Sequence, residues 1–569
     1  MTRRGGRLPW GATGGGGLYG GPRRSTNYGQ IAVLGLIGLG MALVVFWLFG
    51  RMCNSASCND YYCPSGRNIA ALDGYEFASR IFDYNKDKGA VAGNQNLSVQ
   101  VELTKPASDG QSLTFFRYVE ETKNWEPVTP AVLHPSARVV SATLTSPPAI
   151  ITVMRRTAPG GASVAYLQHN EPLNKAAIGH ISIVHTIDFK PLADGSLEGD
   201  LSTLKSDGSF AIYPVVSANN RTKGDVAIVE NILASAESRS NHVNQIVQKA
   251  AQANVKGIDI AYMDLTVTSR TSFTLFVGEL FDKLHAQGKQ LTLTLPSPIK
   301  AQNRIDEGAY DWAELGKRAD LLKIAPYRDQ ATYRLVMPEI LQDLSAKVPP
   351  GKLILTISPY ATETGGDTVN TMSLTAAMAL ATRITVRANA DEITTSSNVK
   401  VAGVNIDKDE GLPGIRWSPE TATVAFSYKQ PQGGGSRTIY LENFFSVGFK
   451  LEYIRTFHLG GVAVEEAGDD VYLGDVWTAL VPFITSGTPI LLQPNSQDLA
   501  PKWKVKDNQG TIEDTGRGSA NWFTPAQPGT YSISLTLSDG VSLYENSVDI
   551  SVKAKTAPAS PTAAPTAAR

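Results

Sequence analysis

Two residues able to do acid–base chemistry lie at one candidate strand, residues 256–263 (KGIDIAYM). Asp259 lies within the strand, and Asp264 directly follows it. Alternate side chains of a strand share a face, so Asp259, Ala261 and Met263 should point to one side and Asp264 to the other. Of these four, only the aspartates can serve as a general acid or base, because methionine cannot donate a proton and alanine cannot hydrogen-bond. Asp264 could replace a lost acid only if the strand has ended before it.

Two further carboxylates, Glu465 and Glu466, follow the apolar run 459–464 (LGGVAV). Glu465 is a second candidate acid, and a helix-capping or solvated role is the alternative. His169 and His185 are lone histidines, and the chain carries no H-E-x-x-H motif, no G-x-S-x-G motif and no Cys–His set. We therefore predict no metal and no cofactor.

The elements that must position these residues alternate between strand and helix patterns across residues 158–490. The apolar strand candidates are, in order, ASVAYLQ, HISIVHTID, FAIYPVV, GIDIAYMDL, QLTLTLP, DLLKIAPY, KLILTISPY and LGGVAV. One helical stretch between them, SNHVNQIVQKAAQAN, places its apolar residues on a single face. This order predicts a (β/α)₈ TIM barrel, with a β insertion at 395–440 after strand seven. The alternative, an open doubly wound sheet, has no G-x-G-x-x-G or P-loop motif to support it.

The strand at 256–263 resembles the signature strand of family 18 glycoside hydrolases, usually written D-G-x-D-x-D-x-E. Neighbouring segments resemble the helix before that strand (AESRSNHVNQIVQKAAQAN), the sixth-strand region (YDWAELGKRADLLKIAPY) and the close of the barrel (GIRWSPETATVAFSY through LEYIRTFHLGGVAVEEAGDD). The closing segment is similar to the subgroup related to spore-cortex and cell-wall hydrolases. The resemblance implies a family 18-like barrel over residues 158–490.

In that family, catalysis is substrate-assisted. A Glu at the end of strand four protonates the glycosidic oxygen, the substrate's acetamido group is the nucleophile, and the Asp two residues earlier orients that group. Here the Glu falls on Met263 and the orienting Asp on Ala261, so the motif is degenerate, and only Asp259 remains a carboxylate. The resemblance leaves no confident catalytic residue, and Glu465 and Asp264 are the fallback acids.

Three residues are expected to contact a ligand. Tyr327 matches the family's sixth-strand Tyr, although Arg328 replaces the Asp that usually follows it. Glu465 sits where the family often has a Trp under the sugar. Asp259 completes the set, and a hydrogen-bonded role in the barrel core is its alternative.

The sequence favours a catalytically inactive barrel that binds cell-wall glycan or a surface protein. The alternative is an active glycosidase with a displaced acid that cuts an N-acetylglucosamine-containing polymer, peptidoglycan or chitin. A third reading is a structural spacer in a surface assembly. Because 52 Lys and Arg balance 53 Asp and Glu, a nucleic-acid partner held by bulk charge is excluded.

An uncharged run at residues 31–50 (IAVLGLIGLGMALVVFWLFG) predicts a transmembrane signal anchor. The arginines before it place the Gly/Arg-rich tail, residues 1–30, in the cytoplasm and the bulk of the chain outside. The sequence therefore predicts a single-pass protein of the cell membrane that contacts the lipid bilayer through residues 31–50.

Three cysteines, Cys53, Cys58 and Cys63, lie in the linker 51–66 that follows this run. Outside the cytoplasm a pair of thiols would oxidise, which makes all three disulfide candidates. The odd cysteine either stays free or bonds to another chain, so a disulfide-linked homodimer is one expectation. Their spacing lacks the C-x-x-C form of a metal site.

Two further segments read as β modules. Residues 67–157 alternate apolar and polar positions between turns, which predicts a β-sandwich, and FFRYVEETKNWEPV resembles hairpins of bacterial surface modules. Residues 491–555 show the same alternation, and WFTPAQPGTYSISLTLSDG resembles the end of immunoglobulin-like or PKD-like modules. The Pro/Ala/Thr-rich residues 556–569 are predicted to be a disordered tail.

Overall fold

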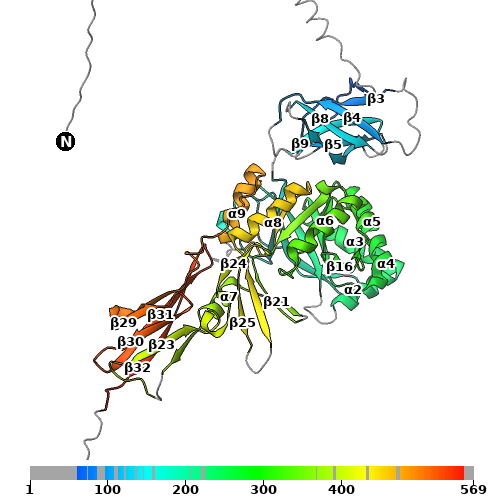
Figure 1. Cartoon of the computed structure of the whole chain (residues 1–569). Coiled ribbons are helices and arrows are strands. Elements are labelled where there is room, and N and C mark those ends of the chain that lie inside the picture. The colour runs from blue at the N-terminus through cyan, green and yellow to red at the C-terminus, as the bar shows by residue number, and fades with distance from the viewer. Residues whose placement is uncertain are drawn as a thin grey trace, which may run out of the picture.

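A computed structural model describes residues 61–556 with short gaps, and Figure 1 shows the described elements as labelled ribbons. The gaps are residues 73–74, 86–95, 108–112, 121–122, 135–137, 145–146, 157–159, 207, 220–224, 367, 389–391, 431–434 and 469–473. The predicted cytoplasmic tail, the predicted span 31–50 and residues 557–569 of the predicted C-terminal tail lie outside the described residues.

The predicted single-pass membrane localisation is corrected. In the part of the chain that the structure describes, no helix combines the length and the apolar character needed to cross a membrane. The run on which that prediction rested, residues 31–50, lies outside this part.

The cysteine prediction falls mostly outside the described residues. Cys63 lies in the short strand β1 (Tyr62–Pro64) and is disulfide-bonded. Cys53 and Cys58 are not among the described residues. A bond between two chains stays a prediction.

The N-terminal β unit consists of two sheets, and one of its two buried clusters contains residues of both sheets. Its further strands are β2 (Tyr75–Phe77), β3 (Phe82–Tyr84), β4 (Leu97–Glu102), β5 (Leu113–Val119), β6 (Asn124–Pro130), β7 (Val132–Leu133), β8 (Val139–Leu144) and β9 (Ile150–Arg156). One sheet has the order β1-β3-β9-β5-β6, with β2 paired to β9, and the other has the order β4-β8-β7. Strand β4 shows why the chain folds this way: Leu97, Val99 and Val101 are buried, and the residues between them are exposed.

Eight parallel strands close into the barrel that the sequence predicts. They are β10 (Ala162–Gln168), β11 (Ile183–Pro191), β13 (Ala211–Ala218), β14 (Gly257–Tyr262), β15 (Gln290–Leu295), β18 (Leu321–Ile324), β19 (Leu353–Ile357) and β27 (Gly461–Val464). Each strand pairs with the next in this order, β27 pairs with β10, and the β10–β11 pairing leaves no gap in the ring. A short strand, β12 (Leu197–Glu198), extends β11 as a hairpin.

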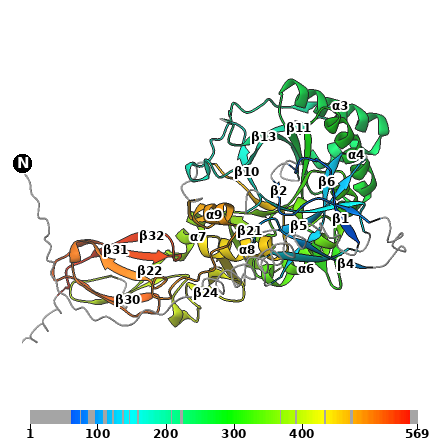
Figure 2. The ribbon, with the colours of Figure 1, turned by 90° about the horizontal axis from the view of Figure 1, so that it is seen from above.

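Helices cover the outside of the barrel. They are α2 (Asp225–Ala234), α3 (Ala236–Gln252), α4 (Arg270–His285), α5 (Trp312–Lys317), α6 (Tyr333–Lys347), α8 (Phe444–Thr456) and α9 (Gly474–Ser486). Figure 2 looks down on the ring of strands with α3 and α4 at its outer edge. The predicted apolar face of α3 is confirmed, because Val243, Ile246, Val247 and Ala250 are all buried. A hairpin of β16 (Ile299–Ala301) and β17 (Arg304–Asp306) follows the fifth barrel strand.

The predicted insertion lies between the seventh and eighth barrel strands. It contains β20 (Ala361–Gly365), β21 (Thr368–Met372), α7 (Leu374–Ala381), β22 (Ile384–Arg387), β23 (Asn398–Gly403), β24 (Arg416–Ser418), β25 (Thr423–Lys429) and β26 (Ser436–Leu441). Five of these strands form one antiparallel sheet of order β21-β20-β26-β25-β24. The insertion leaves from the carboxyl end of β19. By contrast, the N-terminal unit contacts the amino end of the barrel, where Arg156 donates a hydrogen bond of 2.8 Å to the Leu459 carbonyl.

The other two strands of the insertion belong to a sheet completed by the C-terminal segment. The C-terminal strands are β28 (Lys502–Val505), β29 (Thr511–Asp514), β30 (Ser519–Phe523), β31 (Gly529–Ser538) and β32 (Leu543–Val552). One sheet has the order β22-β23-β30-β29, in which Val401 pairs with Ala520, and the other has the order β28-β31-β32. Val399 and Trp522 lie in one buried cluster with Ile533 and Leu535, so two distant stretches of the chain share a core. The sequence pattern predicts separate modules divided at residue 490, whereas the structure joins these stretches in one sheet and one core.

A chain that ends at residue 490 is therefore expected to lose stability or to become insoluble. Such a chain keeps β23 but removes its partner β30, and it uncovers Val399 and Val401, which are at most 1 % exposed. Thermal unfolding and the soluble fraction on expression are the measurements. The matched control ends at residue 556 and should unfold like the full chain. Equal melting temperatures for all three chains would contradict a shared core.

Candidate functional site

The side chains of β14 divide between the inside and the outside of the barrel as their spacing predicts. Ala261 packs against the apolar cluster inside the barrel, which includes Val164 and Val215. Ile258 and Ile260 lie in the large cluster between the barrel and its helices. The position that corresponds to the orienting Asp of the resembled motif therefore points inward and carries only a methyl group.

Asp259 is completely buried, and both oxygens of its carboxylate accept hydrogen bonds. Lys323 of β18 places Nζ 2.5 Å from Oδ1, and both side chains are 0 % exposed. Two hydroxyls of β15 also donate to Asp259: Thr292 to Oδ1 at 2.8 Å and Thr294 to Oδ2 at 2.7 Å. Burial opposes ionisation of Asp259, but the Lys323 ammonium and the Thr294 hydroxyl hold its pKa below the usual value. Asp259 is thus a core residue, and a ligand at the mouth cannot touch it.

Lys323, Tyr166 and His185 complete this internal network, and sequence analysis assigned none of them a role. The Tyr166 hydroxyl lies 2.5 Å from Thr294 Oγ1, and its ring packs against His185 with the centroids 4.9 Å apart. A single lysine in the apolar run DLLKIAPY was the available signal for Lys323. A charge inside an otherwise apolar barrel strand needs a buried counter-ion, and Asp259 was the candidate.

Acid is expected to destabilise the barrel through His185. Burial, together with the charge of Lys323, lowers the pKa of His185 to about 3. An unfolded chain takes up this proton near pH 6.5 and the folded chain does not, so stability is intact above pH 6.5 and falls as the pH approaches 3. At pH 4.5 the loss is about 3 kcal/mol. Denaturant unfolding at several pH values should show a shallower slope for His185→Gln, and an unchanged slope would contradict this assignment.

Met263 and Asp264 both follow the last residue of strand four, Tyr262. Met263 is half-buried, and its amide donates to the Ala218 carbonyl at 2.8 Å. Asp264 is exposed and has a φ of 61°, in the left-handed region. Its charge acts on Tyr310, whose pKa is raised mainly by burial and whose ring packs against Phe273 in the outer cluster. Strand β14 ends at Tyr262, two residues before Asp264, so strand parity no longer fixes the direction of the Asp264 side chain.

Glu465 stands at the mouth of the barrel in an ion pair. It follows β27, and Arg328, which follows β18, places Nη2 2.6 Å from Glu465 Oε1. The other guanidinium nitrogen, Nη1, donates to Ser358 Oγ at 2.7 Å, so Arg328 joins the carboxyl ends of strands six, seven and eight. The side chain of Arg328 is 30 % exposed and that of Glu465 is 22 % exposed. The two departures from the family pattern thus compensate each other's charge.

Tyr327 lies beside this group, because it lines one small cavity together with Arg328 and Ser358. Its hydroxyl is 2.9 Å from Thr332 Oγ1, its ring approaches Tyr333, and it packs against the cluster outside the barrel. Of the three expected ligand contacts, Asp259 is buried in the barrel, whereas Tyr327 and Glu465 both follow the carboxyl ends of barrel strands.

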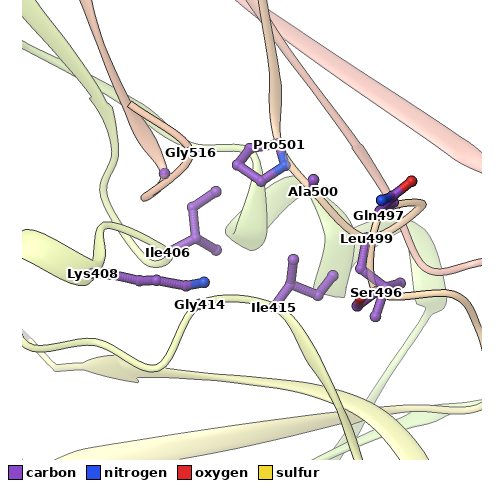
Figure 3. A pocket seen from close by; sticks show the side chains of 11 residues that line it. Ile406, Lys408, Gly414, Ile415, Ser496, Gln497, Leu499, Ala500, Pro501 and Gly516 are labelled. Atoms are coloured by element: carbon purple, nitrogen blue, oxygen red, sulfur yellow. The ribbon is translucent and has the colours of Figure 1, made fainter. Parts of the chain in front are cut away.

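A separate pocket of about 260 Å³ lies between the insertion and the C-terminal segment (Figure 3). Its apolar lining includes Ile406, Ile415 and Leu499, and Lys408 extends along one side. Lys408 is the one ionisable residue among those that line it, so the pocket holds no carboxylate that could protonate a glycosidic oxygen. It is a feature of the shared core rather than a candidate active site.

Comparison with known proteins assigns the barrel. Residues 224–470 match the family described as glycosyl hydrolases family 18. The chain contains a family 18 domain. The match starts after β13, so it covers the strand of the degenerate motif, the Arg328–Glu465 pair and the insertion. The fold places the first three barrel strands in the same ring as the matched part.

Relatives of the family 18 domain are distant. YdhD of Bacillus subtilis (strain 168), a candidate sporulation-specific glycosylase, is 23 % identical over 171 residues, which is 28 % of this chain. The match spans 40 % of the length of YdhD. Similar solved structures include the spore cortex-lytic enzyme SleL of Bacillus cereus, with 19 % identity, 62 % of this chain and 77 % of that chain covered, and a TM-score of 0.44. A chitinase from Chromobacterium violaceum ATCC 12472 has 19 % identity, covers 56 % of this chain and 98 % of its own, and has a TM-score of 0.42.

Proposed function

We propose that the family 18 domain binds a glycan containing N-acetylglucosamine, such as a cell-wall glycan, without cutting it. The observation that carries this proposal is the state of strand four. Met263 and Ala261 occupy the positions of the acid and of the orienting carboxylate, and Asp259 is held in a fully buried ion pair with Lys323. Substrate-assisted hydrolysis requires a proton donor and an oriented acetamido group, and this strand supplies neither.

The remaining carboxylates near the mouth do not favour hydrolysis. Asp264 is exposed to solvent beyond the end of β14, where the backbone is left-handed. Glu465 Oε1 accepts a hydrogen bond from Arg328 at 2.6 Å, so this oxygen is already held by another side chain. A general acid must reach the glycosidic oxygen, so the contact with Arg328 argues against the displaced-acid reading.

Binding is supported by the polar groups at the mouth. Arg328, Ser358 and Glu465 join three strand ends, and Arg328 and Glu465 remain partly exposed. Carboxylate and guanidinium groups that are already positioned by each other can hydrogen-bond sugar hydroxyl and acetamido groups at little entropic cost. The N-terminal unit contacts the amino end of the barrel, which is the end opposite the mouth.

One observation favours an active enzyme as the second candidate. Glu465 Oε2 is buried and makes no hydrogen bond within the described part of the chain. An unsatisfied carboxylate oxygen at the end of a barrel strand is where a relocated acid would be found. Hydrolysis by Glu465 would require the ion pair with Arg328 to open when the substrate binds.

The test incubates the full chain with insoluble peptidoglycan and, separately, with chitin. Co-sedimentation and released reducing sugar are scored in the same tubes. We expect binding without release, and a roughly tenfold or greater loss of affinity in the double variant Arg328→Ala, Glu465→Ala, because hydrogen bonds to charged groups contribute about 1.5–3 kcal/mol.

A matched control removes a similar exposed pair from the N-terminal unit. Arg117 and Glu126 form such a pair at 2.7 Å, and the variant Arg117→Ala, Glu126→Ala should bind like the wild type. Binding that survives loss of the mouth pair would place the site elsewhere. Sugar release by the wild type would establish the second candidate.

A further inference from the structure

A small cavity lies at the root of the insertion, beside the barrel mouth. Its lining includes Ser358, which follows β19, and Thr362 of β20, where the chain enters the insertion. It also includes Glu442, between β26 and α8, where the chain returns to the barrel. Arg328 and Tyr333 form further parts of the lining. The cavity volume is about 10 Å³. A single water requires roughly 10–15 Å³ measured in this way, so there is room for one small molecule only.

Three hydroxyl groups in the lining have no partner in the described protein. They are those of Tyr333, Thr356 and Thr362, and each oxygen is buried. The whole residues are only 3 %, 6 % and 8 % exposed, respectively. They come from three separate elements: α6, the barrel strand β19 and the first strand of the insertion, β20. A buried hydroxyl without a hydrogen bond is destabilising by about 1–3 kcal/mol, so three around one cavity are not expected by chance.

The charges around the cavity are paired. Lys450 Nζ lies 2.5 Å from Glu442 Oε2, and the same ammonium is 4.6 Å from the centre of the Tyr333 ring. Ser446 donates to the other oxygen of Glu442 at 3.1 Å. On the opposite side, Arg328 is paired with Glu465. An ion of either sign would disturb two compensated pairs, whereas a neutral molecule that both donates and accepts would not.

We propose that this cavity binds one structural water that bridges Tyr333, Thr356 and Thr362. Water fits the volume, the neutral surroundings and hydroxyl groups that can each donate or accept. The bridge joins the helix layer, the barrel and the insertion at the point where the insertion leaves the barrel. It is a binding site of the fold and does not depend on whether the mouth holds a glycan.

The sign of a stability change tests the proposal. Thr356→Val and Thr362→Val keep the side-chain shape and remove one hydroxyl each. If the water is bound, each variant loses a hydrogen bond to it, and the melting temperature should fall by about 2–4 °C. If the hydroxyls have no hydrogen-bond partner, valine removes an unsatisfied buried polar group, and the melting temperature should rise. A rise in both variants overturns the proposal.

A control and a second measurement keep the result clear. Thr375 also carries a buried hydroxyl without a partner in the described protein but does not line the cavity, so Thr375→Val should not lower the melting temperature. A crystal structure at high resolution, collected with and without a bromide soak, then identifies the occupant. Density within hydrogen-bond distance of all three hydroxyls and no anomalous signal is expected. An anomalous peak would make the site a halide site, and absence of density would refute a bound water.

Discussion

Replacing Asp259 with alanine is expected to destabilise the protein by about 3–5 kcal/mol, since it leaves the Lys323 ammonium buried with no counter-ion. The pair is 0 % exposed on both sides, so solvent cannot take over the lost interaction. The two threonine hydroxyls that donate to Asp259 also lose their acceptor. Chemical denaturation followed by circular dichroism measures the free energy of unfolding.

A second variant distinguishes a buried charge from a general loss of packing. Asp259→Asn together with Lys323→Met removes both charges and keeps an acceptor for the threonines. Replacement of a whole buried pair is often close to neutral, so the double variant should recover most of the lost stability. The single variant Lys323→Met should be intermediate, because Thr292 and Thr294 still hydrogen-bond the carboxylate. Additive losses in the double variant would show that the ion pair is not the reason for the effect.

The second large effect concerns catalysis: we expect no turnover of chitooligosaccharides or peptidoglycan by the wild type above a blank. General acid catalysis alone is typically worth about 10²–10⁴-fold, and loss of the orienting carboxylate removes more. The variant Ala261→Asp, Met263→Glu restores both groups at the motif positions and should give a trace of activity. Full activity is not expected, because Arg328 and Glu465 also depart from the family pattern.

The control for this rescue is the variant Ala261→Asn, Met263→Gln, which matches the size of the restored side chains but contains no acid. This control variant should show no hydrolytic activity. If the wild type hydrolyses the polymer and Glu465→Gln does not, the inactive-barrel proposal is contradicted and Glu465 is established as a displaced acid. Hydrolysis that disappears in Asp264→Asn instead would point to a local shift at the end of strand four.

The barrel could be predicted from the sequence because its information is local. Each of the eight strands is an apolar run, and helix α3 shows its buried face in the spacing of Val243, Ile246 and Ala250. The inward orientation of Ala261 follows from strand parity in the same way. These features need no knowledge of which strands are neighbours.

What the sequence could not supply was the identity of distant partners. Asp259 was expected both as a ligand contact and as a buried residue, and its partner Lys323 on another strand decides between the two. The Arg328–Glu465 pair likewise joins residues far apart in the chain, so each looked like a separate loss from the family pattern. Tyr327 matched a family position in type, but its hydroxyl is taken by Thr332 in the next turn of chain.

The sheet shared by the insertion and the C-terminal segment also fixes the order in which the protein can be completed. During synthesis β23 leaves the ribosome well before β30, its hydrogen-bonding neighbour, and the eighth barrel strand emerges between them. At about 5–20 residues per second, the open edge of β23 must wait on the order of ten seconds. During that interval the edge is available to other strands, including those of neighbouring nascent chains. The last strands of the chain therefore cover the exposed edge of β23 and complete the fold. In cells with limited chaperone capacity, chains that stop before β30 should aggregate.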